Sequence, residues 1–352
     1  MTNNQTIKSK GYAVKAAKEK LIPYEFERRA LRPKDVALDI SYAGICHSDI
    51  HQAREEWGPA LFPMVPGHEI VGTVTAVGNQ VTKFKVGELI GVGVFVDSCR
   101  NCSNCKSDLE QYCVEGMTGT YNGYERDKKT IAFGGYCDKF VIDEAYAVKV
   151  PANLDLPGVA PLMCAGITLY SPLRTWNAGK GKKVAVMGLG GLGHMGVKFA
   201  VAMGAEVTVL SHSASKEADA KKMGAHHFVC TKDIKVLDSL KMNFDLILNT
   251  VSADIDVDPY LKTLRLDGTM VVIGLPGKPY AVNVGTMLDQ RRRLAGSMIG
   301  GMKELQEMLD FCGKHNIVSD VEVIKADYIN TAYDRTVASD VKYRFVIDAK
   351  TF

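Results

Sequence analysis

The chain has 352 residues, which is enough for about two domains. Its hydrophobic content of 46% and charged content of 24% are typical of a soluble globular protein. The formal net charge of +3 is too small to indicate binding to nucleic acid or to an anionic membrane, so neither is expected as a partner.

We expect neither a signal peptide nor a membrane span. Residues Met1–Lys10 are polar, and the most apolar region, Val184–Leu210, is interrupted by His194, Lys198 and Glu206. The nine cysteines are an odd number, which favours reduced thiols and metal ligands over a disulfide framework. These features predict a cytoplasmic enzyme.

The first 150 residues are predicted to form short strands joined by frequent turns. Glycine and proline recur between apolar runs with β character, which are Val36–Ile40, Ile70–Val77, Leu89–Val96 and Lys139–Ile142. This pattern favours an antiparallel barrel or sandwich over a doubly wound sheet.

The pattern changes after Pro151. Residues Ala160–Ala178 look helical, although Pro172 is expected to kink or divide that helix. From Lys183 onwards strands and helices alternate, which predicts a parallel sheet with helices on both faces. The expected strands are Val184–Met187, Val207–Leu210, His227–Cys230, Asp245–Asn249, Met270–Ile273, Leu294–Ile299 and Arg344–Asp348, and the expected helices are Met195–Met203, Lys216–Met223, Tyr260–Arg265 and Met302–His315.

A glycine-rich turn between the first strand and helix of this region has the spacing of a dinucleotide site. Gly188 permits the tight turn, and Gly190 has no side chain that would keep a pyrophosphate from the backbone. Gly193 allows close packing of helix and strand, and the helix N-terminus faces the phosphates. Residues Gly191 and Leu192 complete the predicted cofactor loop, and Ile273 and Gly274, at the end of a later strand, are also expected to contact the cofactor.

The end of the next strand lacks the acidic residue that usually binds the ribose hydroxyls of NAD. Ser211, Ser213, Ser215 and Lys216 are found there instead. Hydroxyls and a cation can hold a 2′-phosphate, whereas a carboxylate would repel it. The same residues could also form a polar turn that caps the following helix, and both roles are compatible. The sequence therefore favours NADP(H) over NAD(H).

Four cysteines, Cys99, Cys102, Cys105 and Cys113, have the close spacing of a metal site. Four thiolates can complete a tetrahedral shell around zinc, which leaves no open position and makes the site structural. Such an ion would order the loop 97–114, which has few apolar residues. Free thiols and an iron–sulfur cluster are the alternatives.

A second possible metal site is dispersed along the chain. Cys46, His68 and Cys164 would supply two thiolates and an imidazole, a ligand set that leaves one position of a catalytic zinc open. Spacing alone does not select these three residues, because buried cysteines are usually inert.

The chain resembles the zinc-containing medium-chain alcohol dehydrogenases over nearly its full length, and especially their cinnamyl alcohol dehydrogenase-like, NADP-dependent aldehyde reductase branch. The resemblance rests on the ordered blocks Gly44–Asp49, Pro66–Glu69, the four cysteines, Cys164–Gly166, Gly188–Gly196 and Asp340–Asp348. It implies a chaperonin-10-like (GroES-like) β-barrel catalytic domain into which a doubly wound, Rossmann-type α/β domain is inserted. The expected limits are 1–155 and 295–352 for the catalytic domain and 156–294 for the nucleotide domain.

The resemblance also assigns the dispersed metal ligands. Cys46, His68 and Cys164 are implied to bind the catalytic zinc, and Glu69 occupies the position of an alternative fourth ligand. Asp49 is implied to orient His68 through a hydrogen bond. With the four-cysteine lobe, this gives two zinc ions per chain.

A proton path is implied as well, from Ser48 through the cofactor ribose to His51. Serine can donate and accept a proton, and imidazole as a side-chain type titrates near neutral pH. His51 could instead be an ordinary polar surface residue. His47, next to Cys46, is expected to contact a cofactor phosphate rather than the metal.

The substrate pocket is less defined. Trp57, Phe95 and Ile299 fit pocket-lining positions of the family, although large apolar residues are usually core. An aromatic-lined pocket would favour apolar or aromatic aldehydes. The family pattern fits less well around Thr118–Lys129, so one pocket wall stays unassigned.

The leading interpretation is a zinc-dependent, NADP(H)-linked alcohol dehydrogenase that works mainly as an aldehyde reductase on small molecules. An NAD-linked polyol or secondary-alcohol dehydrogenase is one alternative, and a zinc-stabilised binding protein without catalysis is another. Members of the family commonly pair through an edge strand of the nucleotide domain, here Leu294–Ile299, so a homodimer is expected.

Overall fold

The computed structural model describes residues 5–352, so the first four residues of the polar stretch Met1–Lys10 lie outside the described part. The chain forms two compact units. One comprises the residues up to Ile167 together with Gly300–Phe352, and the other comprises Thr168–Ile299. The domain limits expected from the sequence stay a prediction, and the two units are described separately below.

The larger unit is built around a mixed sheet of seven strands in the order β11-β5-β4-β3-β19-β18, with β10 also paired to β3. All neighbours are antiparallel except β18 and β19. The strands are β3 (Asp35–Gly44), β4 (Ile70–Val77), β5 (Leu89–Val92), β10 (Lys139–Asp143), β11 (Ala147–Lys149), β18 (Val321–Ile324) and β19 (Arg344–Asp348).

Three short two-stranded sheets and five α-helices complete the described part of this unit, with α4 running on into the smaller unit. The paired strands are β1 (Ile7–Ala13) with β2 (Ile22–Arg28), β6 (Phe95–Asp97) with β7 (Thr118–Gly119), and β8 (Gly123–Tyr124) with β9 (Ile131–Ala132). The helices are α1 (His47–Ala53), α2 (Ser103–Lys106), α3 (Leu156–Val159), α9 (Met302–His315) and α10 (Ile329–Val337).

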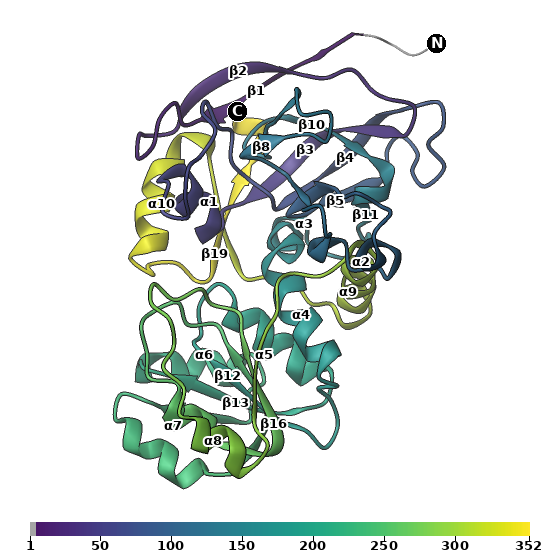
Figure 1. Cartoon of the computed structure of the whole chain (residues 1–352). Helices are drawn as coiled ribbons and strands as arrows, with labels where there is room; N and C mark the ends of the chain where they lie inside the picture. Colours follow the sequence, from purple (N-terminus) through teal and green to yellow (C-terminus); the bar gives the residue numbers. More distant parts are fainter. Residues whose placement is uncertain (1–4) are drawn as a thin grey trace. The chain divides into compact units, whose positions relative to one another are not determined.

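A strand from the C-terminal part of the chain joins this sheet beside one from the N-terminal part. Strand β19, near the C-terminus, pairs with the end of β3, with Val346 opposite Gly44 (Figure 1). Phe345 and Ile347 of β19 are buried in a core that also contains Ile45 and Ile50 from the α1 region. The return of the chain to its first domain, which the family resemblance implies, is therefore present in the fold.

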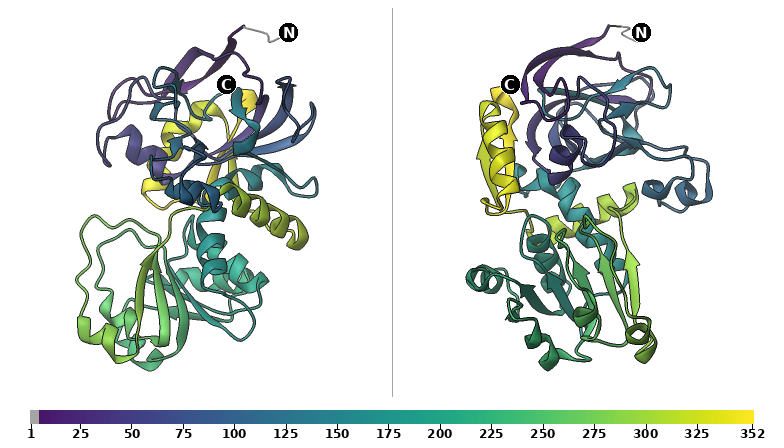
Figure 2. Two further views of the ribbon diagram at one scale, coloured as in Figure 1. Left: turned by 45° about the vertical axis from the view of Figure 1, so that its right-hand side comes forward. Right: turned by 60° about the vertical axis from the view of Figure 1, so that its left-hand side comes forward.

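The smaller unit contains a parallel sheet of six strands in the order β14-β13-β12-β15-β16-β17. Numbered from the first strand of the unit, this order is 3-2-1-4-5-6, that of a doubly wound dinucleotide fold. The views of Figure 2 show helices on both sides of the sheet. The elements are α4 (Ala165–Thr175), β12 (Lys183–Met187), α5 (Gly193–Ala202), β13 (Glu206–Ser211), α6 (Glu217–Lys222), β14 (His227–Cys230), β15 (Phe244–Asn249), α7 (Asp258–Leu261), β16 (Leu264–Val272), α8 (Val284–Asp289) and β17 (Arg293–Gly296).

The long helix expected at Ala160–Ala178 is divided, but not at its proline. Helix α3 and a 3-10 turn (Ala160–Met163) end at Cys164, and α4 then runs through Pro172 without interruption. A proline removes one helix hydrogen bond, and the buried residues Leu169 and Leu173 hold α4 in place around it. The break falls where the backbone turns to present Cys164, at φ −128° and ψ −69°.

Other predicted elements also differ from the structure. The apolar run Leu89–Val96 forms two strands, β5 and β6, because the chain leaves the sheet at Gly93. The expected helix Tyr260–Arg265 ends at Leu261, and its last residues begin β16, where neighbouring strands override a short helical pattern. The strand expected at Leu294–Ile299 ends at Gly296, and Ile299 has a φ of +39°.

No single helix in the described part of the chain is long and apolar enough to cross a membrane. The segments Leu156–Met163 and Ala165–Thr175 meet the length and composition requirements only together, and they are bent by 60°.

Candidate active site

Four buried side chains from separate parts of the larger unit converge on one point. Cys46 lies just before α1, His68 and Glu69 lie just before β4, and Cys164 lies at the break before α4. One ligand atom from each of the four lies within 4.8 Å of the others. The fold thus assembles the dispersed residues that spacing alone did not select.

The chemistry of this group fits a metal ion. Nε2 of His68 and Oε2 of Glu69 are buried and have no hydrogen-bond partner among residues 5–352. A buried polar atom without a partner costs about 1–3 kcal/mol, and a bound cation would remove that cost. Two thiols, an imidazole and a carboxylate are donors that suit tetrahedral zinc.

The start of α1 fixes the direction of the Cys46 thiol. The backbone N–H of Cys46 donates to Oδ2 of Asp49 at 2.9 Å, and the N–H of Asp49 donates to the Cys46 carbonyl at 3.0 Å. Asp49 is fully buried and also accepts from Nδ1 of His68, at 3.0 Å. This hydrogen bond leaves Nε2 of His68 as the ring nitrogen available to a metal.

The two cysteines share an electrostatic environment suited to a cation. Hydrogen bonding with Cys164 lowers the pKa of the Cys46 thiol well below its usual range, against the effect of burial. The same contact, together with burial, raises the pKa of Cys164. Burial lowers the pKa of His68, but the Asp49 carboxylate more than reverses this and the pKa is raised. The contact between the two cysteines therefore favours the thiolate form of Cys46 at the point where a cation would bind.

Arg344 is a part of this site to which the sequence assigned no role. Its Nη2 donates to Oε1 of Glu69 at 2.6 Å and to the carbonyl of Ile45 at 2.8 Å. Burial raises the pKa of Glu69 to about 8, although the guanidinium acts in the opposite direction. An arginine at the start of the apolar strand β19 was the available signal, because a buried cation needs a partner.

Two tyrosines to which the sequence assigned no role also lie next to the candidate ligands. The Tyr121 ring lies parallel to the His68 ring, with 5.8 Å between centroids and 17° between planes. The Tyr136 hydroxyl donates to Oδ2 of Asp49 at 2.9 Å. Tyr121 lies in Thr118–Lys129, the segment that the sequence left unassigned, so this segment covers one side of the site.

The residues of the predicted proton path lie together on α1. Ser48 Oγ is 3.5 Å from Cys46 Sγ, and the rings of His47 and His51 are 5.3 Å apart. Nδ1 of His51 is 2.5 Å from Oε2 of Glu56, and the His51 side chain is 29% exposed. The series thus extends from beside a candidate ligand to the protein surface.

The three predicted pocket residues occupy different surroundings. Trp57 is 49% exposed and stacks on His51, with 4.7 Å between ring centroids. Phe95 is buried and packs edge-to-face on Tyr146. Ile299 is buried at the end of the smaller unit. Their role in substrate binding stays a prediction.

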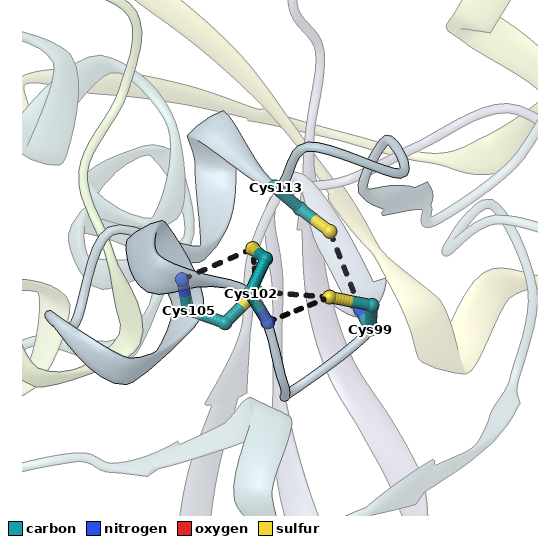
Figure 3. A group of neighbouring side chains, drawn as sticks. All are labelled: Cys99, Cys102, Cys105 and Cys113. Carbon is teal, nitrogen blue, oxygen red and sulfur yellow. Dashed lines mark hydrogen bonds between the residues drawn. The ribbon is translucent and has the colours of Figure 1, made fainter.

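The four cysteines of the loop form a second convergent group (Figure 3). Their sulfur atoms all lie within 4.8 Å of one another, and none of them is in a disulfide bond. Backbone N–H groups point at the sulfurs, from Cys102 to Cys99 at 3.3 Å and from Cys99 to Cys113 at 3.3 Å. Hydrogen bonds, first among them that from the Cys105 N–H, lower the pKa of Cys102 to about 6. This donor set fits a four-thiolate zinc.

The glycine turn of the smaller unit has the shape that a pyrophosphate needs. Gly188 has a φ of +85°, and a Cβ on Gly193 would lie 2.0 Å from the Gly188 carbonyl oxygen. A Cβ on Gly190 would meet nothing within 4 Å, so space remains above the backbone there. Helix α5 begins at Gly193 and directs its N-terminal N–H groups toward this turn.

The predicted phosphate-selecting residues gather next to the same turn. Ser211 ends β13, and its Oγ accepts from the Ser213 N–H at 3.3 Å. The Ser213 and Ser215 hydroxyls are 2.8 Å apart, and Lys216 Nζ donates to the Leu189 carbonyl at 2.8 Å. The lysine therefore bridges the serine turn and the glycine turn.

The other predicted cofactor residues lie at the same edge of the parallel sheet. Ile273 and Gly274 follow β16, and both of their N–H groups donate to the Asn249 carbonyl, at 2.9 and 3.0 Å. The loop residues Gly191 and Leu192 directly precede α5. This is the edge formed by the carboxyl ends of the strands, where doubly wound folds bind their ligands.

Comparison with known families gives matches over both units. The profile of the "Alcohol dehydrogenase GroES-like domain" family matches residues 32–152, and that of the "Zinc-binding dehydrogenase" family matches residues 191–314. These matches confirm the predicted fold class.

Individual proteins match over almost the whole chain. A relative named "NADP-dependent alcohol dehydrogenase C 1" from Mycolicibacterium smegmatis is 57% identical over 96% of this chain and 97% of its own. "Aldehyde reductase YahK" from Escherichia coli is 49% identical over 98% of this chain and 99% of its own. A solved cinnamyl alcohol dehydrogenase from Sorghum bicolor superposes with a TM-score of 0.94 at 42% identity, over 98% of both chains.

Two family profiles, nearly full-length identity to alcohol dehydrogenases and a matching solved structure agree with the folded sites described above. The family resemblance seen in the sequence is thereby confirmed. The chain belongs to the zinc-binding dehydrogenases of the alcohol dehydrogenase family that carry a GroES-like domain.

Proposed function

We propose that this chain catalyses hydride transfer between NADP(H) and a primary alcohol or aldehyde, mainly in the direction of aldehyde reduction. The observation that carries the proposal is the pair of buried atoms without partners, Nε2 of His68 and Oε2 of Glu69, beside two cysteines. A metal ion bound at this point would give both atoms a partner, which the protein's own packing does not.

The catalytic ion in this proposal is held by Cys46, His68 and Cys164, with Glu69 as the alternative ligand. Bound there, zinc supplies Lewis acidity toward the oxygen of the substrate carbonyl. Asp49 keeps the His68 ring oriented through the 3.0 Å contact to Nδ1. The buried thiolate of Cys46 contributes negative charge that holds the ion.

The protein's own hydroxyl and imidazole groups supply the proton that aldehyde reduction consumes. Ser48, beside Cys46, is the hydroxyl that would pass a proton to the substrate oxygen, and a bound cofactor would supply a ribose hydroxyl between Ser48 and His51. His51, which contacts Glu56 and is partly exposed, exchanges that proton with solvent.

The cofactor in this proposal is NADP(H), which supplies the hydride. The open space at Gly190 accepts the pyrophosphate, and Ser211, Ser213 and Lys216 hold the 2′-phosphate. The relative from Mycolicibacterium smegmatis, named as NADP-dependent, supports the same choice. His47, Ile273 and Gly274 complete the proposed contacts.

The four-cysteine lobe is proposed to hold a second, structural zinc, which gives two ions per chain. We also propose a cytoplasmic location and a homodimer. The parallel sheet ends at β17, whose outer side has no neighbouring strand in the described chain and is proposed to face the partner subunit.

The preferred substrates are proposed to be aromatic or medium-sized apolar aldehydes. Trp57, Phe95 and Ile299 are the proposed pocket residues. The relative from Escherichia coli named as an aldehyde reductase and the cinnamyl alcohol dehydrogenase structure support this class.

The test is the initial rate of NADPH and NADH oxidation with cinnamaldehyde, on protein whose zinc content is measured in the same sample. We expect rapid oxidation of NADPH, slower oxidation of NADH and two zinc ions per chain. One zinc ion and no turnover would instead support a zinc-stabilised binding protein. Two zinc ions without aldehyde reduction would indicate a polyol or secondary-alcohol dehydrogenase.

A further inference from the structure

Asp49 is a buried carboxylate whose hydrogen-bonding capacity is full. Its Oδ2 accepts from the N–H of Cys46 and from the hydroxyl of Tyr136, both at 2.9 Å. Its Oδ1 accepts from Nδ1 of His68 at 3.0 Å and from the N–H of Gly67 at 3.2 Å. A carboxylate has about four acceptor positions, so every position is used.

Two of these four donors come from candidate zinc ligands and one from the residue preceding a ligand. Tyr136 is the exception, because it lies about 70 residues away in sequence from the nearest of the others. It is also the donor that could be removed without changing a ligand or its backbone.

The backbone around Tyr136 is tied to the segment that leads into His68. The N–H of Tyr136 donates to the Pro66 carbonyl at 2.9 Å, and the N–H of Gly135 donates to the Gly67 carbonyl at 2.9 Å. On the other side, the Tyr12 N–H donates to the Tyr136 carbonyl at 2.9 Å. The backbone that carries the Tyr136 phenol is therefore held by hydrogen bonds on both sides.

The ring of Tyr136 lies directly against Gly67. A Cβ at Gly67 would be 2.5 Å from Cδ1 of that ring, and Gly67 has a φ of +104°. Any other residue at position 67 would displace the ring and strain the backbone next to His68. Gly67 thus has a packing reason to be glycine, and the reason is the position of Tyr136.

We propose that Tyr136 is a positioning residue for the catalytic zinc, which acts through Asp49 to fix the orientation of the His68 imidazole. The proposal rests on the proposed function, since it assumes that His68 binds zinc. The hydroxyl holds Oδ2 of Asp49, so that Oδ1 stays aimed at Nδ1 of His68. Without it, the buried carboxylate loses one of its four donors and can rotate away from the imidazole.

The test compares Tyr136→Phe with Tyr333→Phe as a matched control. Tyr333 is buried, and its ring packs edge-to-face on Tyr136 at 6.4 Å. Among residues 5–352, the Tyr333 hydroxyl makes no hydrogen bond to Asp49. Both variants remove one hydroxyl from the same region, but only one removes a donor to Asp49.

The primary measurement is zinc affinity by competition with a chelator, corrected for the zinc that the Cys164→Ala variant retains on the cysteine lobe. We expect Tyr136→Phe to weaken zinc binding about tenfold, because loss of a partner that orients a ligand typically costs 10- to 100-fold. Tyr333→Phe should stay within about twofold of the wild type. The visible spectrum of cobalt-substituted protein should change in the first variant alone.

A double-mutant cycle separates orientation from general packing. In an Asp49→Asn background, Tyr136→Phe should cause no further loss of zinc affinity, because the route through the carboxylate is already broken. An equal tenfold loss in both backgrounds, or no loss in either, would overturn the proposal. If the wild type holds no more zinc than Cys164→Ala, there is no catalytic zinc. That result would contradict the proposed function, independently of the result for Tyr136→Phe.

Discussion

Arg344 and Glu69 form a buried ion pair, in which Nη2 of the arginine lies 2.6 Å from Oε1 of the glutamate. The two side chains are 6% and 0% exposed. The pair connects the C-terminal strand β19 to the residue that follows His68. Its removal therefore tests how the end of the chain supports the candidate metal site.

We expect Arg344→Met to lower the free energy of unfolding by about 3 kcal/mol, because it leaves a buried carboxylate without its partner. The Ile45 carbonyl also loses a donor. The measurement is urea denaturation of the zinc-loaded protein. Combining the change with Glu69→Gln should recover much of the loss, since the unpaired carboxyl group is then gone.

Arg126→Met is the control for this prediction. Arg126 pairs with Glu115 at 2.7 Å, but their side chains are 30% and 63% exposed. A surface pair contributes about 0–1 kcal/mol. Equal losses in the Arg344 and Arg126 variants would contradict the importance given to the buried pair.

Removal of a candidate catalytic ligand should cost one metal ion and the activity. We expect Cys164→Ala to contain one zinc ion per chain where the wild type contains two, and to lose turnover, because an open zinc site needs three protein ligands. Metal analysis and NADPH oxidation measure the two effects. Cys312→Ala is the control, since Cys312 is also buried but contacts Met308. A fully active Cys164→Ala enzyme would show that the catalytic site has been misplaced.

Substitution of a cysteine in the four-cysteine lobe should have a different effect from Cys164→Ala. Beyond its own loop, the lobe contacts the start of α9, where Oε2 of Glu110 accepts from the Met302 N–H at 3.1 Å and Lys303 pairs with Asp108 at 3.0 Å. We expect Cys102→Ser to lose the other zinc ion, to lower the melting temperature and to expose the loop 97–114 to proteolysis, because few apolar residues hold this loop.

Limited proteolysis and metal analysis of the same sample check this. Cys230→Ser, a half-buried cysteine of the smaller unit, should keep both ions and the wild-type cleavage pattern. An intact loop after loss of the ion would mean that the zinc does not order it.

The sequence predicted best what depends on local pattern. The strands Ile70–Val77, His227–Cys230 and Arg344–Asp348 and the helix Met302–His315 have the predicted limits in the structure. The strands are short apolar runs, and the helix has its buried residues at helical spacing. The four cysteines and the glycine turn were also recognisable, because each of these two sites is formed by residues of one short segment.

Features that depend on contacts between distant parts of the sequence were not predictable from local patterns. The interruption at Cys164 follows from bringing that thiol to Cys46, and no local signal marks it. The roles of Arg344 and Tyr136 arise from partners about 275 and 87 residues away. A single sequence gives no information about such pairings, since the residues meet only after the sheet has formed.

Cofactor choice can be tested at the end of β13. We expect Ser211→Asp to lower kcat/KM for NADPH by about tenfold or more, because a carboxylate would lie against the 2′-phosphate and like charges repel. The value for NADH should stay the same or rise, since an acid at this position can bind the ribose hydroxyls. Steady-state kinetics with both cofactors give the ratio.

Ser239→Asp is the control for charge alone. Ser239 is exposed in the same unit, and its hydroxyl donates to the Val236 carbonyl at 2.8 Å. The Ser239→Asp variant adds the same charge at a position away from the glycine turn. An unchanged cofactor ratio in Ser211→Asp would show that the phosphate is bound elsewhere.

Asp245, at the start of β15, should make stability depend on acid pH. Burial raises the pKa of its carboxyl, but the Lys183 N–H, at 2.8 Å, and Arg265 more than reverse this, so the folded pKa lies below its ordinary value. The folded state thus favours the carboxylate. The stabilisation is complete well above the unfolded value and is lost as the pH falls through the folded value.

We therefore expect Asp245→Asn to unfold more easily than the wild type at pH 7, by about 1–2 kcal/mol, because it loses hydrogen bonds to charged groups. The difference should shrink as the pH is lowered below about 4. Melting temperatures of both proteins across this range measure it. Asp238→Asn, which breaks the exposed pair with Lys241, should change stability by less than about 0.5 kcal/mol. A gap between Asp245→Asn and the wild type that persists undiminished at pH 3 would mean that the carboxylate charge is not its source.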